Sequence, residues 1–348
     1  MNIAIGPMLD FLKALLAIPS PTGYHREALP FMEQAFAALA FPGLSIQTTL
    51  KGALLLHISG AADDAPRALA AHADTLGLMV KEIKDSGALK VDRIGGVMWN
   101  GAEFENVTVR TFNDQRYRGT LIPVNPSSHV NPDILTQPRN ADTLEVRLDA
   151  LTTSAAQTRA LGIEVGDFVF LDPRVEQVET GFIRARFLDN KAGVAVIYGA
   201  LQALRDAGIP PAQRTTILIA NYEEVGHGGS HGLPADLHEL LVIDMGALGK
   251  GQNGDEFSVS LCVKDAGGPY HYDMNEKLRR LAQAHNIPLK PDLYPFYRSD
   301  GSAYWAAGGG ARVALIGPGV ASSHSYERTH TDSLAHTAHL IARYLATP

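Results

Sequence analysis

"TTILIANYEEVGHGGS", residues 215–230, joins a short apolar run to a glycine-rich turn. The run 215–220 is typical of a buried strand, and Glu223 and Glu224 follow soon after it. Adjacent residues of an extended segment point to opposite sides, so these two carboxylates can do different jobs at one place. A solvated loop would also explain a lone Glu-Glu pair, so the rest of the chain must decide.

Strand and helix patterns alternate around this stretch. Buried-strand patterns cover 67–71, 239–244 and 311–319, and helical patterns cover about 25–40, 188–208, 272–286 and 331–345. Such alternation predicts an α/β fold with a mostly parallel central sheet flanked by helices.

The sequence pattern changes between residues 77 and 178. Short segments rich in valine and threonine are separated there by glycine, asparagine and aspartate turns, which indicates a small inserted β-barrel or β-sandwich. The sequence therefore predicts a catalytic α/β domain made of 1–76 plus 179–348. Residues 77–178 would form the inserted β domain.

Composition narrows the function. The 348 residues suffice for one large or two moderate domains, and the net charge of −7 without a basic run argues against a nucleic-acid partner. The single cysteine, Cys262, excludes an intrachain disulfide and is expected to be buried. Asp10 and Lys13 interrupt the apolar N-terminus, and no run is long enough to span a membrane, so a cytoplasmic location is predicted.

Polar residues gather where the predicted strands end, which is where ligands bind in open α/β sheets. His72 and Asp74 follow the strand at 67–71, and Asp244 ends the strand at 239–244. His324 lies just after the strand at 311–319, and Asp189 begins a helix. Together with Glu223 and Glu224, these residues are expected to face one crevice.

Imidazole and carboxylate groups are ligands of zinc-type ions, and a pair of such ions ~3.5–4 Å apart needs one shared carboxylate. Glu223 is left over as the general base that activates water. Asp74 suits a partner that orients the His72 imidazole. Five residues then meet the ligand count of two metal ions: His72, Asp189, Glu224, Asp244 and His324.

Each residue also has an ordinary explanation when taken alone. His72 could be a core histidine, Asp189 a helix N-cap and His324 a loop histidine. His227 and His231, in the glycine-rich turn, could form another metal site, although loop polarity explains them better. The chain has neither a phosphate-binding loop nor a G-x-S-x-G elbow, which counts against nucleotide binding and serine-hydrolase chemistry.

Five segments resemble, in order, the metal-site motifs of the TET-type zinc aminopeptidases, a family that includes glutamyl and deblocking aminopeptidases. The segments are HAD (72–74), FLDNKAGVAV (187–196), YEEVGHGGS (222–230), VIDMGA (242–247) and SSHSYE (322–327). The resemblance covers nearly the whole chain, including IPSPTGYHREA (18–28). It implies one zinc at His72 and Asp244, another at Glu224 and His324, and Asp189 between them.

The resemblance also implies an activity and an assembly. Glu223 would be the general base for a water held between two divalent ions, zinc or alternatively cobalt or manganese, and short peptides would lose their N-terminal residues. The inserted domain would be PDZ-like and drive self-association through dimers, up to a tetrahedral dodecamer. There are two alternatives. One is a related carboxypeptidase or N-deacylase, and the other is a metal-binding assembly protein without turnover.

The chain departs from the family pattern at several places. Thr75 stands where a glutamate is usual, ASS (321–323) replaces arginine-tyrosine-methionine, and YRSDGSA (297–303) replaces a glycine-threonine-aspartate. These features look like a bacterial subgroup linked with the N-acetylglutaminylglutamine amide osmoprotectant system. Arg298 and Asp300 are then expected to line the substrate pocket. Arg298 would either favour an acidic or amide side chain or belong to a structural ion pair.

Overall fold

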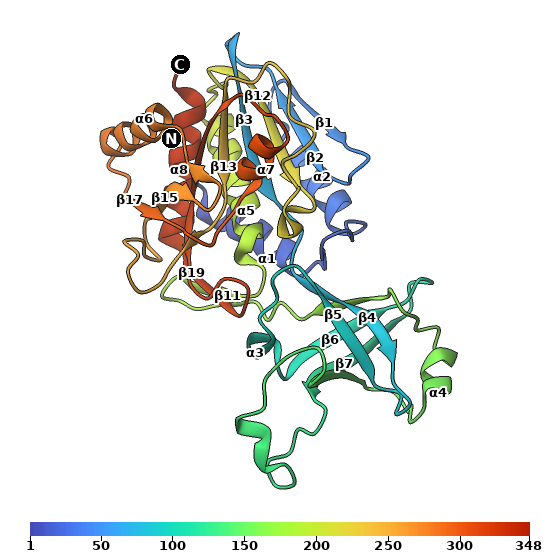
Figure 1. The fold of residues 1–348 in the computed structure, drawn as a ribbon. Helices are drawn as coiled ribbons and strands as arrows, with labels where there is room; N and C mark the ends of the chain where they lie inside the picture. Colours follow the sequence, from blue (N-terminus) through green and yellow to red (C-terminus); the bar gives the residue numbers. More distant parts are fainter. The chain divides into compact units, whose positions relative to one another are not determined.

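The computed structural model describes residues 1–348, which divide into two compact units (Figure 1). The first unit comprises 1–75 and 174–348, and the second comprises 76–173. Residues 174–178, which the sequence placed in the inserted segment, belong to the first unit. Each unit has its own sheet and is described by itself.

The first unit is built on a ten-stranded sheet with helices packed against it. Its helices are α1 (Ile5–Leu16), α2 (Ala28–Ala38), α5 (Leu188–Asp206), α6 (Tyr272–Ala284), α7 (Asp300–Ala306) and α8 (Thr331–Ala346), with the 3₁₀ turn η2 (Glu223–Val225). The sheet contains β1 (Leu44–Thr48), β2 (Leu54–Ile58), β3 (Ala62–His72), β12 (Gln213–Ala220), β13 (Glu239–Ile243), β14 (Gly246–Ala247), β15 (Val259–Asp265), β16 (Gly268–Pro269), β17 (Leu289–Leu293) and β18 (Arg312–Val320). A separate three-stranded sheet contains β10 (Glu176–Gln177), β11 (Phe182–Ala185) and β19 (Glu327–His330).

The centre of the large sheet is parallel, in the order β12-β3-β13-β18, and antiparallel strands flank it. Ala70 of β3 pairs with Leu218 of β12 on one side and with Val242 of β13 on the other. His72 pairs with Ala220, so β3 and β12 end at the same edge. The predicted α/β class is confirmed, and the carboxyl ends of the central strands are brought together.

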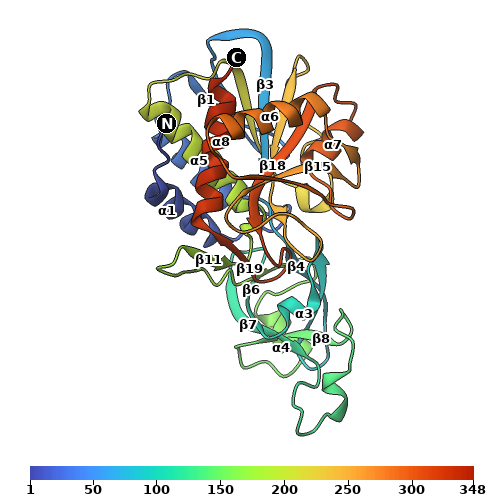
Figure 2. The same ribbon diagram turned by 90° about the vertical axis from the view of Figure 1, so that its left-hand side faces the viewer.

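Both faces of the central strands are buried, which explains their continuous apolar sequence. Ala68 and Ala70 belong to a cluster under Trp305 of α7, and the alternate residue Leu69 points to the opposite face. Figure 2 shows α1, α5 and α8 close together, and α5 packs against both of the others. Cys262 is fully buried in the same apolar cluster as Ala68 and Ala70, as predicted.

The second unit is a closed antiparallel barrel in the strand order β4-β5-β8-β7-β6-β9. Its strands are β4 (Gly77–Ile83), β5 (Leu89–Ile94), β6 (Glu105–Arg110), β7 (Arg116–Pro123), β8 (Leu144–Leu148) and β9 (Phe168–Leu171), joined by α3 (Trp99–Ala102), η1 (Pro132–Leu135) and α4 (Ala155–Ala160). Alternate residues such as Val107 and Val109 fill the interior and are fully buried. The expected small inserted barrel is confirmed. None of the helices is long and apolar enough to span a bilayer.

Candidate active site

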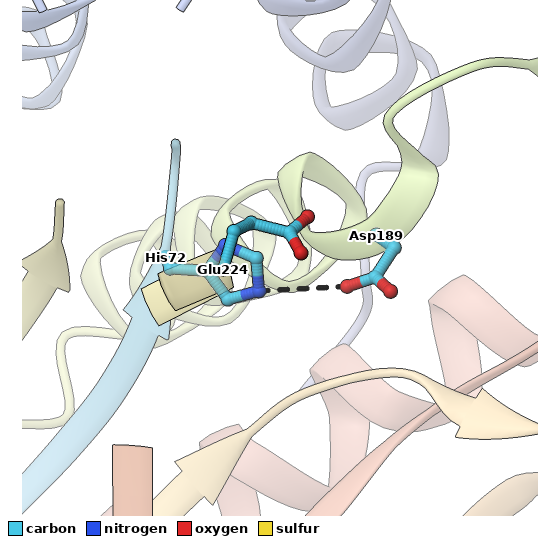
Figure 3. Close-up of side chains that lie close together, drawn as sticks. All are labelled: His72, Asp189 and Glu224. Atoms are coloured by element: carbon cyan, nitrogen blue, oxygen red, sulfur yellow. Dashed lines mark ion pairs between the residues drawn. The ribbon is translucent and has the colours of Figure 1, made fainter. Parts of the chain in front are cut away.

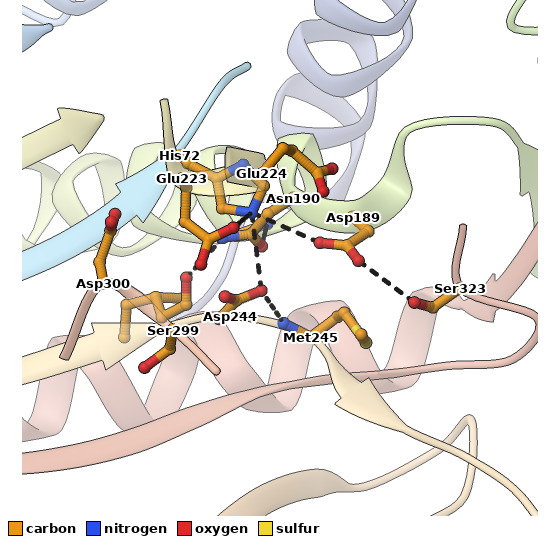
Figure 4. A network of polar contacts seen from close by, with 12 residues as sticks. His72, Asp189, Asn190, Glu223, Glu224, Asp244, Met245, Ser299, Asp300 and Ser323 are labelled. Atoms are coloured by element: carbon orange, nitrogen blue, oxygen red, sulfur yellow. Dashed lines mark hydrogen bonds and ion pairs between the residues drawn. The ribbon is translucent and has the colours of Figure 1, made fainter. Parts of the chain in front are cut away.

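The polar residues predicted at strand ends come together in the first unit (Figure 4). His72 ends β3, Asp244 follows β13, and Glu223 and Glu224 follow β12 in η2. Asp189 lies in the first turn of α5 with a non-helical backbone, and the side chain that accepts a helix N–H at this end is Asn190, from Gly193. The N-cap explanation for Asp189 is therefore set aside by its geometry.

The two carboxylate oxygens of Asp189 face two different histidines. Oδ1 lies 3.4 Å from Nε2 of His72, and Oδ2 lies 3.6 Å from Nε2 of His324. Asp244 Oδ1 is 3.9 Å from the same nitrogen of His72, and Glu224 Oε2 is 3.6 Å from that of His324. These contacts form two groups of potential ligands that share Asp189, an arrangement in which two ions would share one carboxylate.

Two sets of potential ligand atoms are especially compact, with all atoms within 4.8 Å of one another. One set is His72, Asp189 and Glu224, drawn in Figure 3. The other is His72, Glu223 and Asp244. Glu223, expected to stay free of metal, is thus as close to the cluster as the expected ligands, with Oε2 3.5 Å from His72 Nε2.

The two glutamates are not in an extended segment, contrary to the expectation from the sequence. They lie in a 3₁₀ turn flanked by left-handed residues, Tyr222 at φ 77° and Gly226 at φ 85°. Gly226 N–H donates to Glu223 O and closes the turn. Because the turn curls over the strand end, both side chains face the cluster, Glu223 toward His72 and Glu224 toward His324.

Asp74 holds this turn through its carboxylate. Its oxygens accept the backbone N–H groups of Glu223 at 3.1 Å and Glu224 at 3.3 Å, and the hydroxyl of Thr22 at 2.7 Å. His72 Nδ1 lies 3.0 Å from the backbone oxygen of Asp74. A carbonyl oxygen only accepts, so Nδ1 carries the proton and Nε2 is free to bind a cation.

Thr22→Val is expected to lower the free energy of unfolding by about 2 kcal/mol, because it removes a buried hydrogen bond to a charged group. Ser20→Ala is the matched control, since the Ser20 hydroxyl of the same segment donates to a neutral backbone oxygen, that of Ala73. It should cost only about 1 kcal/mol. Urea unfolding of both variants measures the difference, and equal losses would contradict a special role of Thr22.

Burial shifts the pKa values of the residues in the cluster. It raises the pKa of Asp244 to about 8, and it raises the pKa values of Glu223 and Glu224 well above the usual range, with Asp189 adding to the effect on Glu224. Burial by itself lowers the pKa of His72, but the surrounding carboxylates, Glu223 first, raise it well above its ordinary value. So many buried carboxylates call for added positive charge.

The residues present fit divalent metal ions. The donor set is imidazole nitrogen and carboxylate oxygen, which suits zinc and related ions. Oε1 of Glu224 is buried and has no hydrogen-bond partner, an arrangement that is costly unless a cation takes the lone pair. His227 and His231 belong to neither compact ligand set, and the His227 ring stacks on Tyr222.

A cavity of about 440 Å³ opens over the cluster. Its walls include Met245, Phe296 and Tyr297, and Arg298 lines it as expected. The proposed base and most of the proposed ligands lie on its surface, namely Glu223, Asp189, Glu224, Asp244 and His324. The site therefore combines a buried charged floor with largely aromatic and aliphatic walls.

Asp300 was expected to line this cavity, and the structure places it elsewhere. The residue is 1% exposed, and its Oδ1 accepts the N–H of Gly229. A Cβ at Gly228 or Gly229 would lie 2.4 Å or less from Asp300 atoms, so only glycines permit this packing. Asp300 therefore holds the loop that follows the two glutamates and does not line the cavity.

Sequence reasoning gave no role to two residues that support the cluster, Thr22 and Glu327. Both lie inside segments that resemble the family pattern, IPSPTGYHREA (18–28) and SSHSYE (322–327). The carboxylate of Glu327 accepts the backbone N–H of Asp189 and that of His324. The motifs were the only signal, because the contacts join segments distant in the chain.

Comparison with known proteins shows the family to which the chain belongs. Residues 52–340 match the family model described as M42 glutamyl aminopeptidase. The chain belongs to the M42 glutamyl aminopeptidase family. It is therefore a metal-dependent aminopeptidase, a hydrolase that acts on peptide bonds, and the predicted resemblance is confirmed.

The similarity to individual relatives covers nearly the whole chain. It is 43% identical to the "Putative aminopeptidase YhfE" of Bacillus subtilis, over 98% of this chain and 97% of that protein. The fold is similar to that of the TET aminopeptidase from a marine sediment archaeon (Thaumarchaeota), with a TM-score of 0.87, 18% identity and coverage of 97% and 96% of the two chains. It is also similar to the Pyrococcus horikoshii TET1 peptidase, with a TM-score of 0.82, 20% identity and coverage of 98% and 100%.

Proposed function

We propose that this M42 aminopeptidase uses two divalent metal ions per subunit to remove N-terminal residues from short peptides. The supporting observation is the placement of Asp189 between His72 and His324, with one oxygen toward each. His72 and Asp244 would hold one ion, and Glu224 and His324 the other. Zinc is the proposed metal, and cobalt or manganese suit the same ligands.

Bound at this site, the ions would polarise a peptide carbonyl and lower the pKa of water. Glu223 lies on the cavity surface beside His72, where its carboxylate accepts a proton from the attacking water. The same carboxyl group then donates that proton to the nitrogen of the leaving amine. Asp74 keeps Glu223 in position through the backbone N–H of the turn.

The cavity suits the first residues of a peptide. Its charged floor would attract the free α-amine, and its aromatic and aliphatic walls would pack against the N-terminal side chain. Arg298 is exposed at the cavity and would contact an acidic or amide side chain. The osmoprotectant-linked subgroup and the cytoplasmic location stay predictions from the sequence.

We propose self-association through the barrel unit. The similar Pyrococcus horikoshii peptidase can assemble into a tetrahedron or a large octahedral shell, and its chain is matched over its whole length. Several large apolar side chains of the barrel unit are exposed, among them Phe104, Phe112, Val130 and Leu135. Sedimentation or light scattering of the full chain would give the subunit number.

The experiment uses metal-stripped protein and a panel of aminoacyl-anilides, each paired with its N-acetylated form. Reloading zinc, cobalt or manganese should restore cleavage of the free-amine substrates and leave the acetylated ones intact. Cleavage of the acetyl amide of the blocked substrates, without release of the aniline, would favour the N-deacylase alternative. Two bound ions without turnover of any substrate would favour the assembly-protein alternative.

A further inference from the structure

We infer that Glu327 is a positioning residue that sets the spacing of the two metal ligands Asp189 and His324. The inference rests on the proposed two-metal function. It gives a role to a buried carboxylate that does not line the cavity and that the proposed mechanism does not use.

Glu327 begins β19 and is 2% exposed. Its Oε2 accepts the backbone N–H of Asp189 at 3.1 Å, and its Oε1 accepts that of His324 at 3.1 Å. One rigid carboxylate thus joins two segments that are 135 positions apart in the chain, where 324 − 189 = 135. The carboxylate bridges the backbone nitrogens of these two residues, one oxygen to each.

The segment around His324 needs such a support. His324 has φ 67° and Ser322 has φ 60°, a backbone region that side chains other than glycine rarely adopt. The loop between β18 and β19 is closed by the pairing of Ala321 with Arg328, and the Glu327 carboxylate adds the contact that joins His324 to the backbone of Asp189. The bond to Glu327 keeps the His324 backbone in place.

Asp74 makes the same kind of contact on the other side of the cluster, where it accepts the backbone N–H groups of Glu223 and Glu224. Two buried carboxylates therefore hold four residues of the site through their backbone, and neither needs to touch an ion. A carboxylate suits this position because its two oxygens can each accept a backbone N–H, and it has no donor that would oppose one.

Glu327→Gln keeps the size of the side chain but turns one acceptor oxygen into an NH₂ donor. That donor would face a backbone N–H, so one of the two bonds is lost. Glu327→Asp keeps the charge but is one methylene shorter and cannot reach both nitrogens. We expect each variant to weaken the binding of one of the two ions by about 10–100-fold, as is typical for residues that orient metal ligands.

The test is a competition of zinc and cobalt against a chelator of known affinity, with metal content measured per subunit for wild type and both variants. Thr329→Val is the matched control, because Thr329 lies in the same strand, is fully buried and donates to Gly319 O instead. The control should lose stability in thermal unfolding and keep wild-type affinity for both ions.

Weakened binding of one ion in Glu327→Gln and Glu327→Asp, with the control unchanged, would support the inference. Wild-type affinity for two ions in either folded variant would overturn it. If Glu327→Gln does not fold, Glu327→Asp decides alone. Absence of peptide hydrolysis by a wild-type protein with two ions would overturn the proposed function and leave this test intact, since its readout is metal affinity.

Discussion

Glu223→Gln is expected to lower kcat by about 10²–10⁴-fold and to leave close to two metal ions bound per subunit. Glutamine has nearly the same shape, so the turn held by Asp74 should stay in place. The amide cannot accept a proton from water, which removes the proposed general base. Steady-state kinetics on a free-amine anilide, together with metal analysis of the same sample, measures both quantities.

The neighbouring glutamate is the control for this variant. Glu224→Gln should lower activity together with metal content, because Glu224 lies 3.6 Å from His324 Nε2 and is proposed to bind an ion. If Glu223→Gln lost metal as Glu224→Gln does, Glu223 would be a ligand. The compact set of His72, Glu223 and Asp244 would then be the true metal site.

Asp189→Asn is expected to abolish measurable activity, with a loss of about a thousandfold or more. The amide offers a single acceptor oxygen in place of the two that face His72 and His324, so it cannot serve both ions. Loss of metal-ion stabilisation is worth several kcal/mol in the transition state, and each 1.36 kcal/mol is about tenfold in rate. Metal content should fall to one ion per subunit or fewer.

Ser323→Ala is the control for the Asp189 variant. Ser323 donates to Asp189 Oδ2 at 3.2 Å, so its removal disturbs the same oxygen without changing the number of acceptors. We expect two bound ions and a rate loss of about 10–100-fold, the scale for residues that only orient a ligand, against a thousandfold or more for Asp189→Asn. Full occupancy of two ions in Asp189→Asn would refute the shared-carboxylate proposal.

Much of the site could be predicted because its residues follow strand patterns. The apolar runs before His72, Glu223 and Asp244 are unmistakable, and parallel strands end at one edge of a sheet. The local geometry was harder to predict. The 3₁₀ turn of Glu223 and Glu224 depends on the left-handed conformation of Tyr222, which no propensity of tyrosine favours.

The supporting roles of three residues could not be predicted for a different reason, even for Asp300, which was expected in the substrate pocket. Thr22, Asp300 and Glu327 act through contacts with Asp74, Gly229, and the backbone of Asp189 and His324. Most of these contacts join positions far apart in the chain, and most go to backbone groups, which all residues share. A sequence pattern carries no sign of such a contact, and only the folded chain reveals it.

Because buried carboxylates crowd around His72, the folding stability of the protein should depend on bound metal ions. Without cations, the raised pKa values of Glu223, Glu224 and Asp244 mean that folding these groups together is unfavourable at neutral pH. Ions that bind only the folded chain add about 1.4 kcal/mol per site for each tenfold rise in concentration above Kd. A cell short of the metal would therefore hold less folded enzyme. Its proteases would degrade the unfolded fraction.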